Sequence, residues 1–183
     1  MNAYLSFTIG ILCIFMLSAC DHYSERMVQN NAVKFAGITP AAGQGNTFKD
    51  YLAMEYYNLA QYEQKQMFDY KAASLYLNKS ERLQAGAMVS PETIPVKGIS
   101  PVAQAELNLE REKLIAALTD YAIPENRIVL ALAQTRFDCW LDQAQEWPDA
   151  PEKITCKSQY YENMGKLVLP NLEAIENYNF DGA

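Results

Sequence analysis

Between residues 48 and 168 the apolar side chains recur at intervals of three and four positions, the period of an α-helix with one buried face. The first such run begins beside Thr47 and Asp50, which have the spacing of a capping box. A second run ends at Gly86, a residue suited to the left-handed position that follows a helix. The two runs therefore predict a helical hairpin. Its stripes are Phe48, Tyr51, Leu52, Glu55, Tyr56 and Leu59 in the first run, and Phe68, Ala72, Tyr76, Lys79 and Leu83 in the second.

Three further helices are predicted beyond this hairpin. Residues 87–100 contain two prolines and a glycine, which is typical of a loop. Ser100 followed by Pro101 indicates a helix start, and further starts are expected at Pro124 and Pro151. No segment alternates apolar and polar residues as a half-buried strand does. We therefore expect an all-α fold of about five helices, whose first pair has spacing near that of a tetratricopeptide hairpin.

The N-terminal stretch predicts the location of the protein. Residues 5–16 are almost wholly apolar, which fits the central part of a signal peptide but is shorter than the ~20 residues of a membrane-spanning helix. The sequence LSAC that ends at Cys20 resembles the lipobox of bacterial lipoproteins. The resemblance implies that residues 1–19 are removed and that Cys20 is acylated. Since the first residues carry no Lys or Arg, an uncleaved signal anchor or a buried apolar helix is the alternative.

Charge and composition complete the domain organisation. The net charge of −7 argues against nucleic acid as a partner and against direct docking on anionic lipid, so the lipid anchor is expected to hold the protein at the membrane. Asp21 resembles the inner-membrane retention signal of enteric bacteria, which leaves inner and outer membrane open. Residues 20–47 lack sustained periodicity and predict a flexible, lipidated tether. Residues 48–168 are then one helical domain, and residues 169–183 are a C-terminal tail.

Two cysteines remain in the predicted mature domain. Cys139 lies in the fourth expected helix and Cys156 at the start of the fifth, so a disulfide between them would staple a helical hairpin. A metal site or a redox pair is the alternative. Metal binding needs further ligands, however, and the single histidine, His22, lies beside the anchor; redox pairs usually have CxxC spacing.

The stretch AQTRFDCW carries a second resemblance. Together with the segments around it, from residue 48 to residue 167, it resembles the helical N-terminal region of alphaproteobacterial OmpA-family lipoproteins. In that family the helical region precedes an OmpA-like domain that binds peptidoglycan. The sequence stops at residue 183, where the first strand of that domain is expected, so peptidoglycan binding is not carried over. The matching positions are Gln134, Phe137, Asp138, Cys139 and Trp140, with Cys156 as the second cysteine.

No catalytic residue, metal site or cofactor is expected. The predicted domain contains no histidine, which excludes a Ser-His-Asp triad. Glu55 and Glu63 lie about 12 Å apart along one helix, wider than the usual carboxyl pair of a glycosidase. We expect both to be solvated or paired with a neighbouring helix.

Tyrosines crowd the first hairpin, and this residue type is favoured at protein interfaces. We therefore expect a partner-binding surface there, with burial in the core as the alternative. The residues assigned to this surface are Tyr56, Tyr57, Tyr62 and Tyr70.

These expectations combine into one predicted function. The chain is expected to be a non-catalytic binding or scaffold module, anchored in a Gram-negative envelope membrane and facing the periplasm. Its partner would be an envelope protein whose identity the sequence does not indicate. One alternative is an enzyme that cleaves cell-wall glycan with a lone carboxylate, for which a deep cleft with a buried acid would be support. The other is a structural spacer between membrane and wall.

Overall fold

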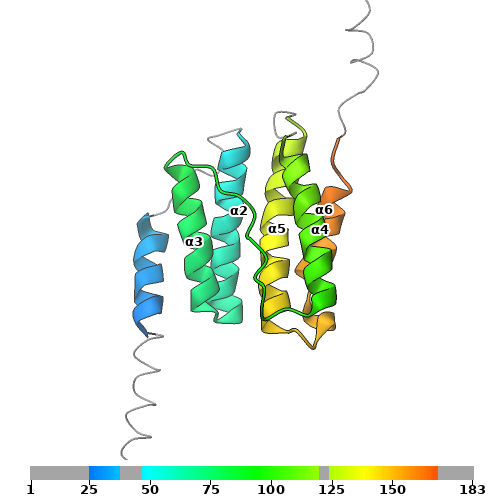
Figure 1. Ribbon diagram of the computed structural model, residues 1–183. Coiled ribbons are helices and arrows are strands. Elements are labelled where there is room, and N and C mark those ends of the chain that lie inside the picture. Colours follow the sequence, from blue (N-terminus) through cyan, green and yellow to red (C-terminus); the bar gives the residue numbers. More distant parts are fainter. Residues whose placement is uncertain (1–24, 38–46, 120–123, 169–183) are drawn as a thin grey trace, which may run out of the picture.

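The computed structural model describes residues 25–37, 47–119 and 124–168, and these residues form an all-α fold (Figure 1). A single π-helical turn, Glu63–Met67, joins the first two long helices, and a 3₁₀ turn, Pro151–Lys153, precedes the last. The expected all-α class is confirmed. The helices are α2 (Phe48–Tyr62), α3 (Tyr70–Gln84), α4 (Pro101–Ala117), α5 (Asn126–Glu146) and α6 (Cys156–Met164), and residues 25–37 form a further helix.

The helix ends follow the capping signals in the sequence. Thr47 caps α2 in a reciprocal capping box, in which the Asp50 carboxylate accepts a hydrogen bond from the Thr47 amide at 3.0 Å. Ser100 caps α4, with Pro101 as its first residue. Gly86, with φ of 91°, follows α3 in a Schellman motif, since its amide donates to the Leu83 carbonyl. These local interactions fix where the helices begin and end.

The helices form two packed groups with α5 between them (Figure 1). The α2–α3 hairpin packs through α2 against α5, and α5 packs in turn against α6 and α4. A long connection, residues 85–100, runs across the bundle from the end of α3 to the start of α4 (Figure 1). Most sides of α5 are therefore covered. The largest fully buried side chains include Trp140, Tyr56, Tyr76, Tyr160, Phe137 and Leu52.

The predicted disulfide is confirmed. Cys139 in α5 is bonded to Cys156, the first residue of α6, with the two Cα atoms 5.8 Å apart. Three aromatic rings pack beside it: Phe137, Trp140 and Tyr160 have centroids 5.7 to 6.1 Å apart. The bridge and this cluster together hold α6 against α5.

The prediction of a flexible tether is wrong for residues 25–37, which form a helix beside the hairpin (Figure 1). The Asn31 side chain is fully buried and donates a hydrogen bond to the Tyr70 carbonyl at 3.0 Å. The Phe35 ring meets Tyr57 edge to face, with centroids 5.4 Å apart. This helix has a buried face at four-residue spacing, but the residue at its centre is polar, so hydrophobic periodicity does not reveal it.

Several predictions fall on residues outside the described ranges. These are the signal peptide (1–19), acylated Cys20, the retention signal at Asp21 and the tail (169–183). They stay predictions. In the ranges that the structure describes, no helix has the length and apolar character needed to cross a bilayer.

Candidate functional site

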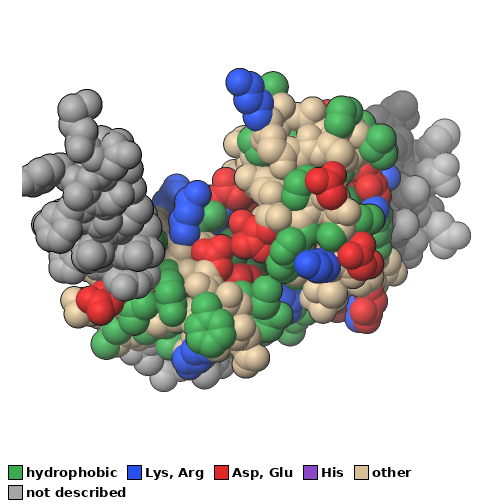
Figure 2. Space-filling model, turned by 90° about the horizontal axis from the view of Figure 1, so that it is seen from below, with side chains coloured by type: hydrophobic (Ala, Val, Ile, Leu, Met, Phe, Trp, Pro, Cys, Tyr) green, Lys and Arg blue, Asp and Glu red, His purple; other side chains and the backbone are tan. Residues whose placement is uncertain are grey.

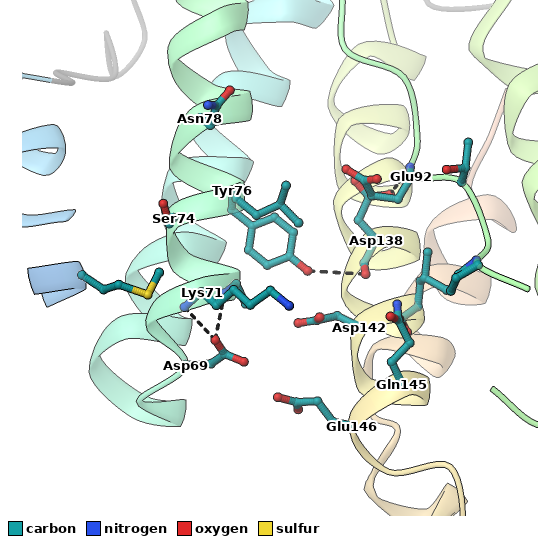
Figure 3. A pocket seen from close by; sticks show the side chains of 16 residues that line it. Asp69, Lys71, Ser74, Tyr76, Asn78, Glu92, Asp138, Asp142, Gln145 and Glu146 are labelled. Atoms are coloured by element: carbon teal, nitrogen blue, oxygen red, sulfur yellow. Dashed lines mark hydrogen bonds between the residues drawn. The ribbon is translucent and has the colours of Figure 1, made fainter. Parts of the chain in front are cut away.

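A cleft of about 780 Å³ opens between α3 and α5. It lies at the end of the bundle where Asp69 begins α3 and Glu146 ends α5. Viewed from this end, the surface is hollowed and acidic side chains gather in the hollow (Figure 2). Side chains from the two helices face each other across the cleft (Figure 3).

The floor of the cleft is a buried ion-pair network centred on Asp138. One carboxylate oxygen, Oδ2, accepts from the Tyr56 hydroxyl at 2.6 Å and from Lys79 Nζ at 2.5 Å. The other oxygen accepts from the Glu92 amide at 2.8 Å, and Lys79 also pairs with the Glu92 carboxylate at 2.7 Å. Burial raises the pKa of Asp138, while Lys79 opposes the rise. Both oxygens of this acid are committed to structural partners, which does not suit a proton-transfer role.

The same network fastens the connection that crosses the bundle. The Gln134 amide donates to the Val89 carbonyl at 2.8 Å. Arg111 donates through Nε to the Glu92 carbonyl at 2.7 Å and through a terminal nitrogen to the Pro91 carbonyl at 3.1 Å. Buried main-chain groups of an irregular segment need such partners. Gln134 and Asp138, two of the three buried polar residues of the AQTRFDCW stretch, therefore serve the fold.

The wall of the cleft on α5 carries an acidic stripe. Asp138, Asp142 and Glu146 follow one another at four-residue spacing. The side chains of Asp142 and Glu146 point toward Lys71 and Asp69 on the α3 side (Figure 3). Like charges at this spacing destabilise a helix. Glu146 also ends α5, where the helix dipole disfavours a negative charge. Asp138 is balanced by its buried pair with Lys79, but Asp142 and Glu146 oppose helix stability, so the fold itself does not explain these two residues.

Three carboxyls around the cleft have strongly raised pKa values. Burial raises the pKa of Asp142 to about 6, with Asp69 adding to the rise and Lys71 opposing it. Glu146 is an exposed residue, but partial burial of its carboxyl and a hydrogen bond with Asp69 raise its pKa to about 7. Burial and the charge of Asp142 raise the pKa of Glu63 to about 7 as well. Glu63 is 6% exposed, and its expected solvation or pairing with a neighbouring helix is wrong. We call Glu63, Asp142 and Glu146 the three shifted carboxyls; burial and mutual repulsion both favour their protonated forms.

An apolar groove of about 400 Å³ continues from the acidic end of the cleft. Met27, Met67, Phe68 and Tyr70 supply its apolar side chains. It shares Met27 and the charged residues Asp69, Lys71 and Glu146 with the cleft. Phe68 has a φ of 58° and is 67% exposed, although its predicted place was on a buried stripe. A bulky residue at positive φ is strained. The hairpin turn thus holds an exposed ring in an unfavourable backbone conformation.

The four tyrosines assigned to a partner surface do not lie on one surface. Tyr56 is 0% exposed and belongs to the buried network, so its assignment is wrong. Tyr57 is half-buried against the N-terminal helix, and Tyr62 is 45% exposed beside the disulfide. Tyr70 alone lines the groove. The residues that sequence reasoning missed are Asp142, Glu146 and the exposed Phe68.

The described residues contain no group of three or more histidine, cysteine, aspartate or glutamate side chains arranged to hold a metal ion. Comparison of the chain with protein-family models, curated proteins and solved structures found no match. The case for a functional site therefore rests on the geometry of the cleft and its groove.

Proposed function

We propose that the protein is a membrane-anchored periplasmic lipoprotein that acts as a non-catalytic binding module of the Gram-negative envelope. The observation that carries the binding role is the open cleft between α3 and α5. Its buried acid is held by structural hydrogen bonds, whereas the carboxyls nearer its mouth are crowded and disfavour their own charge. A cationic group of a partner would relieve this repulsion.

The lipobox-like sequence supports the anchoring role. Met27, which lines the cleft and the groove, follows Cys20 by seven residues. Seven residues span at most about 25 Å when fully extended. An acylated Cys20 would therefore hold this end of the cleft within that distance of the membrane surface. Confinement of this kind raises the effective concentration of the cleft toward membrane-bound partners.

The test is chemical crosslinking in intact Gram-negative cells that express the full chain, followed by purification from the membrane fraction. Mass spectrometry then reads both the acylation of Cys20 and the identity of crosslinked partners. We expect acylated Cys20, a reproducible protein adduct, and loss of both membrane association and the adduct in Cys20→Ser. An unacylated, soluble protein without adducts would contradict the proposal. Acylation without adducts would favour a structural spacer.

A second candidate function is cleavage of cell-wall glycan by a carboxyl acid. The raised pKa of Glu146, about 7, in an open cleft favours it, because a general acid must stay protonated near the working pH. Incubation of the purified protein with isolated peptidoglycan tests this candidate. Release of new reducing ends that is lost in Glu146→Gln would establish the enzyme. No release would leave the binding role.

A further inference from the structure

We infer that the apolar groove and the adjoining acidic end of the cleft bind a peptide segment in which a large apolar side chain neighbours basic residues. This inference rests on the proposed binding role and specifies the chemistry of the partner. The apolar side chain would occupy the groove beside Phe68. The basic side chains would reach the carboxylates of Asp69, Asp142 and Glu146, which lie at the same end of the cleft.

The exposed, strained residue in the groove does not help to stabilise the fold. Phe68 exposes two thirds of its side chain, so the ring gains little from burial within this chain, while its backbone stays at positive φ. Glycine or asparagine adopts this conformation with less strain. Phe68 projects next to Met27 and Met67, and methionine adapts its shape to varied apolar partners. A large apolar side chain from a partner would cover these three residues.

Charge selects the kind of segment that fits. Asp69 and Glu146 line both the groove and the cleft, and Asp142 lies one helical turn before Glu146. Lys71 is the basic residue that lines both hollows. The rim is therefore net acidic, and it would attract Lys or Arg and repel acidic segments. It would also repel anionic lipid headgroups, which makes a basic peptide the occupant that fits the groove.

Fluorescence anisotropy with the full-length protein in a neutral detergent tests the inference. Three dye-labelled tetrapeptides serve as probes: Lys-Phe-Lys-Lys, its acidic counterpart Glu-Phe-Glu-Glu, and the polar counterpart Lys-Ser-Lys-Lys. We expect the first to bind, the second not to bind, and the third to bind about tenfold more weakly because it lacks the apolar anchor. Affinity for the first should fall as salt concentration rises.

Variants separate recognition from folding. Phe68→Gly relieves the backbone strain and removes the ring, so it should weaken binding about tenfold without lowering the urea midpoint. The pair Asp142→Asn and Glu146→Gln should weaken binding about tenfold and flatten the salt dependence. The matched controls Ile128→Ala and Glu112→Gln change exposed side chains that line neither hollow, and affinity should stay unchanged.

Equal binding of all three peptides, or full binding by Phe68→Gly, would overturn the inference. Binding to mixed micelles of the neutral detergent and phosphatidylglycerol in place of the peptide, with Phe68→Gly abolishing that binding, would overturn it in favour of a lipid. The inference also fails if no peptide binds. If acylated Cys20 and a crosslinked partner are nevertheless found in cells, the proposed function stands without it. A soluble protein without adducts would instead contradict the proposed function.

Discussion

The substitution Lys79→Met tests the buried network that forms the floor of the cleft. The Lys79 side chain is 4% exposed and pairs with Asp138, whose side chain is 0% exposed, at 2.5 Å. It also pairs with Glu92, whose side chain is 36% exposed, and lies 5.0 Å from the Tyr56 ring centroid. Methionine keeps the length of the apolar stem and removes the charge. The Asp138 carboxylate would then be buried without its cation.

The expected loss follows from the burial of each partner. Breaking a buried pair by removing one member costs about 3–5 kcal/mol, because the remaining charge cannot be rehydrated. The Glu92 carboxylate reaches water and adds little. Asp138 keeps hydrogen bonds from Tyr56 and from the Glu92 amide, which places the estimate at the low end. We expect Lys79→Met to lower the free energy of unfolding by about 3 kcal/mol at pH 8.

The loss should shrink as the pH falls. Burial already raises the pKa of Asp138, and removal of Lys79 raises it further because a cause that lowers it disappears. The folded variant therefore binds a proton more readily than the unfolded chain, and its stability increases from pH 8 to pH 5 relative to wild type. At pH 5 we expect the difference to be about 1 kcal/mol, the contribution of ordinary hydrogen bonds.

Urea denaturation followed by tryptophan fluorescence measures these differences, since Trp140 is buried beside the disulfide. The matched control is Lys166→Met, which breaks a surface pair with Glu162 and should leave the urea midpoint unchanged. A loss below about 1 kcal/mol at pH 8, or a loss that does not change between pH 5 and pH 8, would show that Lys79 does not compensate a buried charge on Asp138.

Three further predictions concern stability. Phe68→Gly should raise the free energy of unfolding by about 0.5–1 kcal/mol, because it relieves positive-φ strain while removing an exposed ring; a decrease in the urea midpoint would contradict this. Replacing Cys139 and Cys156 with alanine opens a bridge between residues 17 apart and should cost about 3 kcal/mol by the same assay; an unchanged midpoint would show that the bridge does not constrain the unfolded chain. The three shifted carboxyls have raised pKa values in the folded state, so the folded protein binds more protons than the unfolded chain between about pH 4 and pH 7. Their contribution should make the protein about 1–3 kcal/mol more stable at pH 5 than at pH 8, an estimate discounted for solvent screening; equal stability, or no flattening when all three are changed to their amides, would contradict it.

Local signals predicted the starts of α2 and α4 and the end of α3. The start expected at Pro151 is wrong, because Pro151–Lys153 is a 3₁₀ turn and α6 begins at Cys156. The capping residues Thr47 and Ser100 and the left-handed Gly86 act within one turn of sequence, so their effect can be read without knowledge of the tertiary fold. The disulfide between Cys139 and Cys156 could also be predicted, since few other partners were available to either cysteine.

The cleft was missed because its residues do not follow the apolar pattern. Asp138, Asp142 and Glu146 share one face of α5 at four-residue spacing, and a search for acidic periodicity would have found them. These residues form the wall of a cleft only because the crossing connection and α3 close its other sides. The N-terminal helix was missed because Asn31, at the centre of its buried face, is polar and bonds to the distant Tyr70 carbonyl.

Whether each tyrosine is buried depends on contacts between residues that are far apart in the sequence. The buried Tyr56 hydroxyl donates a hydrogen bond to the carboxylate of Asp138, 82 residues away. Composition indicates that a tyrosine suits either a core or an interface, and it does not distinguish the two. The most exposed aromatic of this hairpin is Phe68 at the turn, where a helical stripe predicted a buried ring. The π-helical turn before it shifts the register and turns the ring outward.

The most direct test of a binding cleft is site-specific photocrosslinking in intact cells. A photoreactive phenylalanine analogue is placed at Leu75, which lines the cleft, or at Ile128, which lines neither the cleft nor the groove. The two side chains are 43% and 48% exposed, so their access to solvent is matched. We expect one reproducible protein adduct from position 75, absent from position 128 and reduced when Asp142→Asn and Glu146→Gln are added. Equal adducts from both positions, or an adduct from position 128 alone, would contradict a binding role for the cleft.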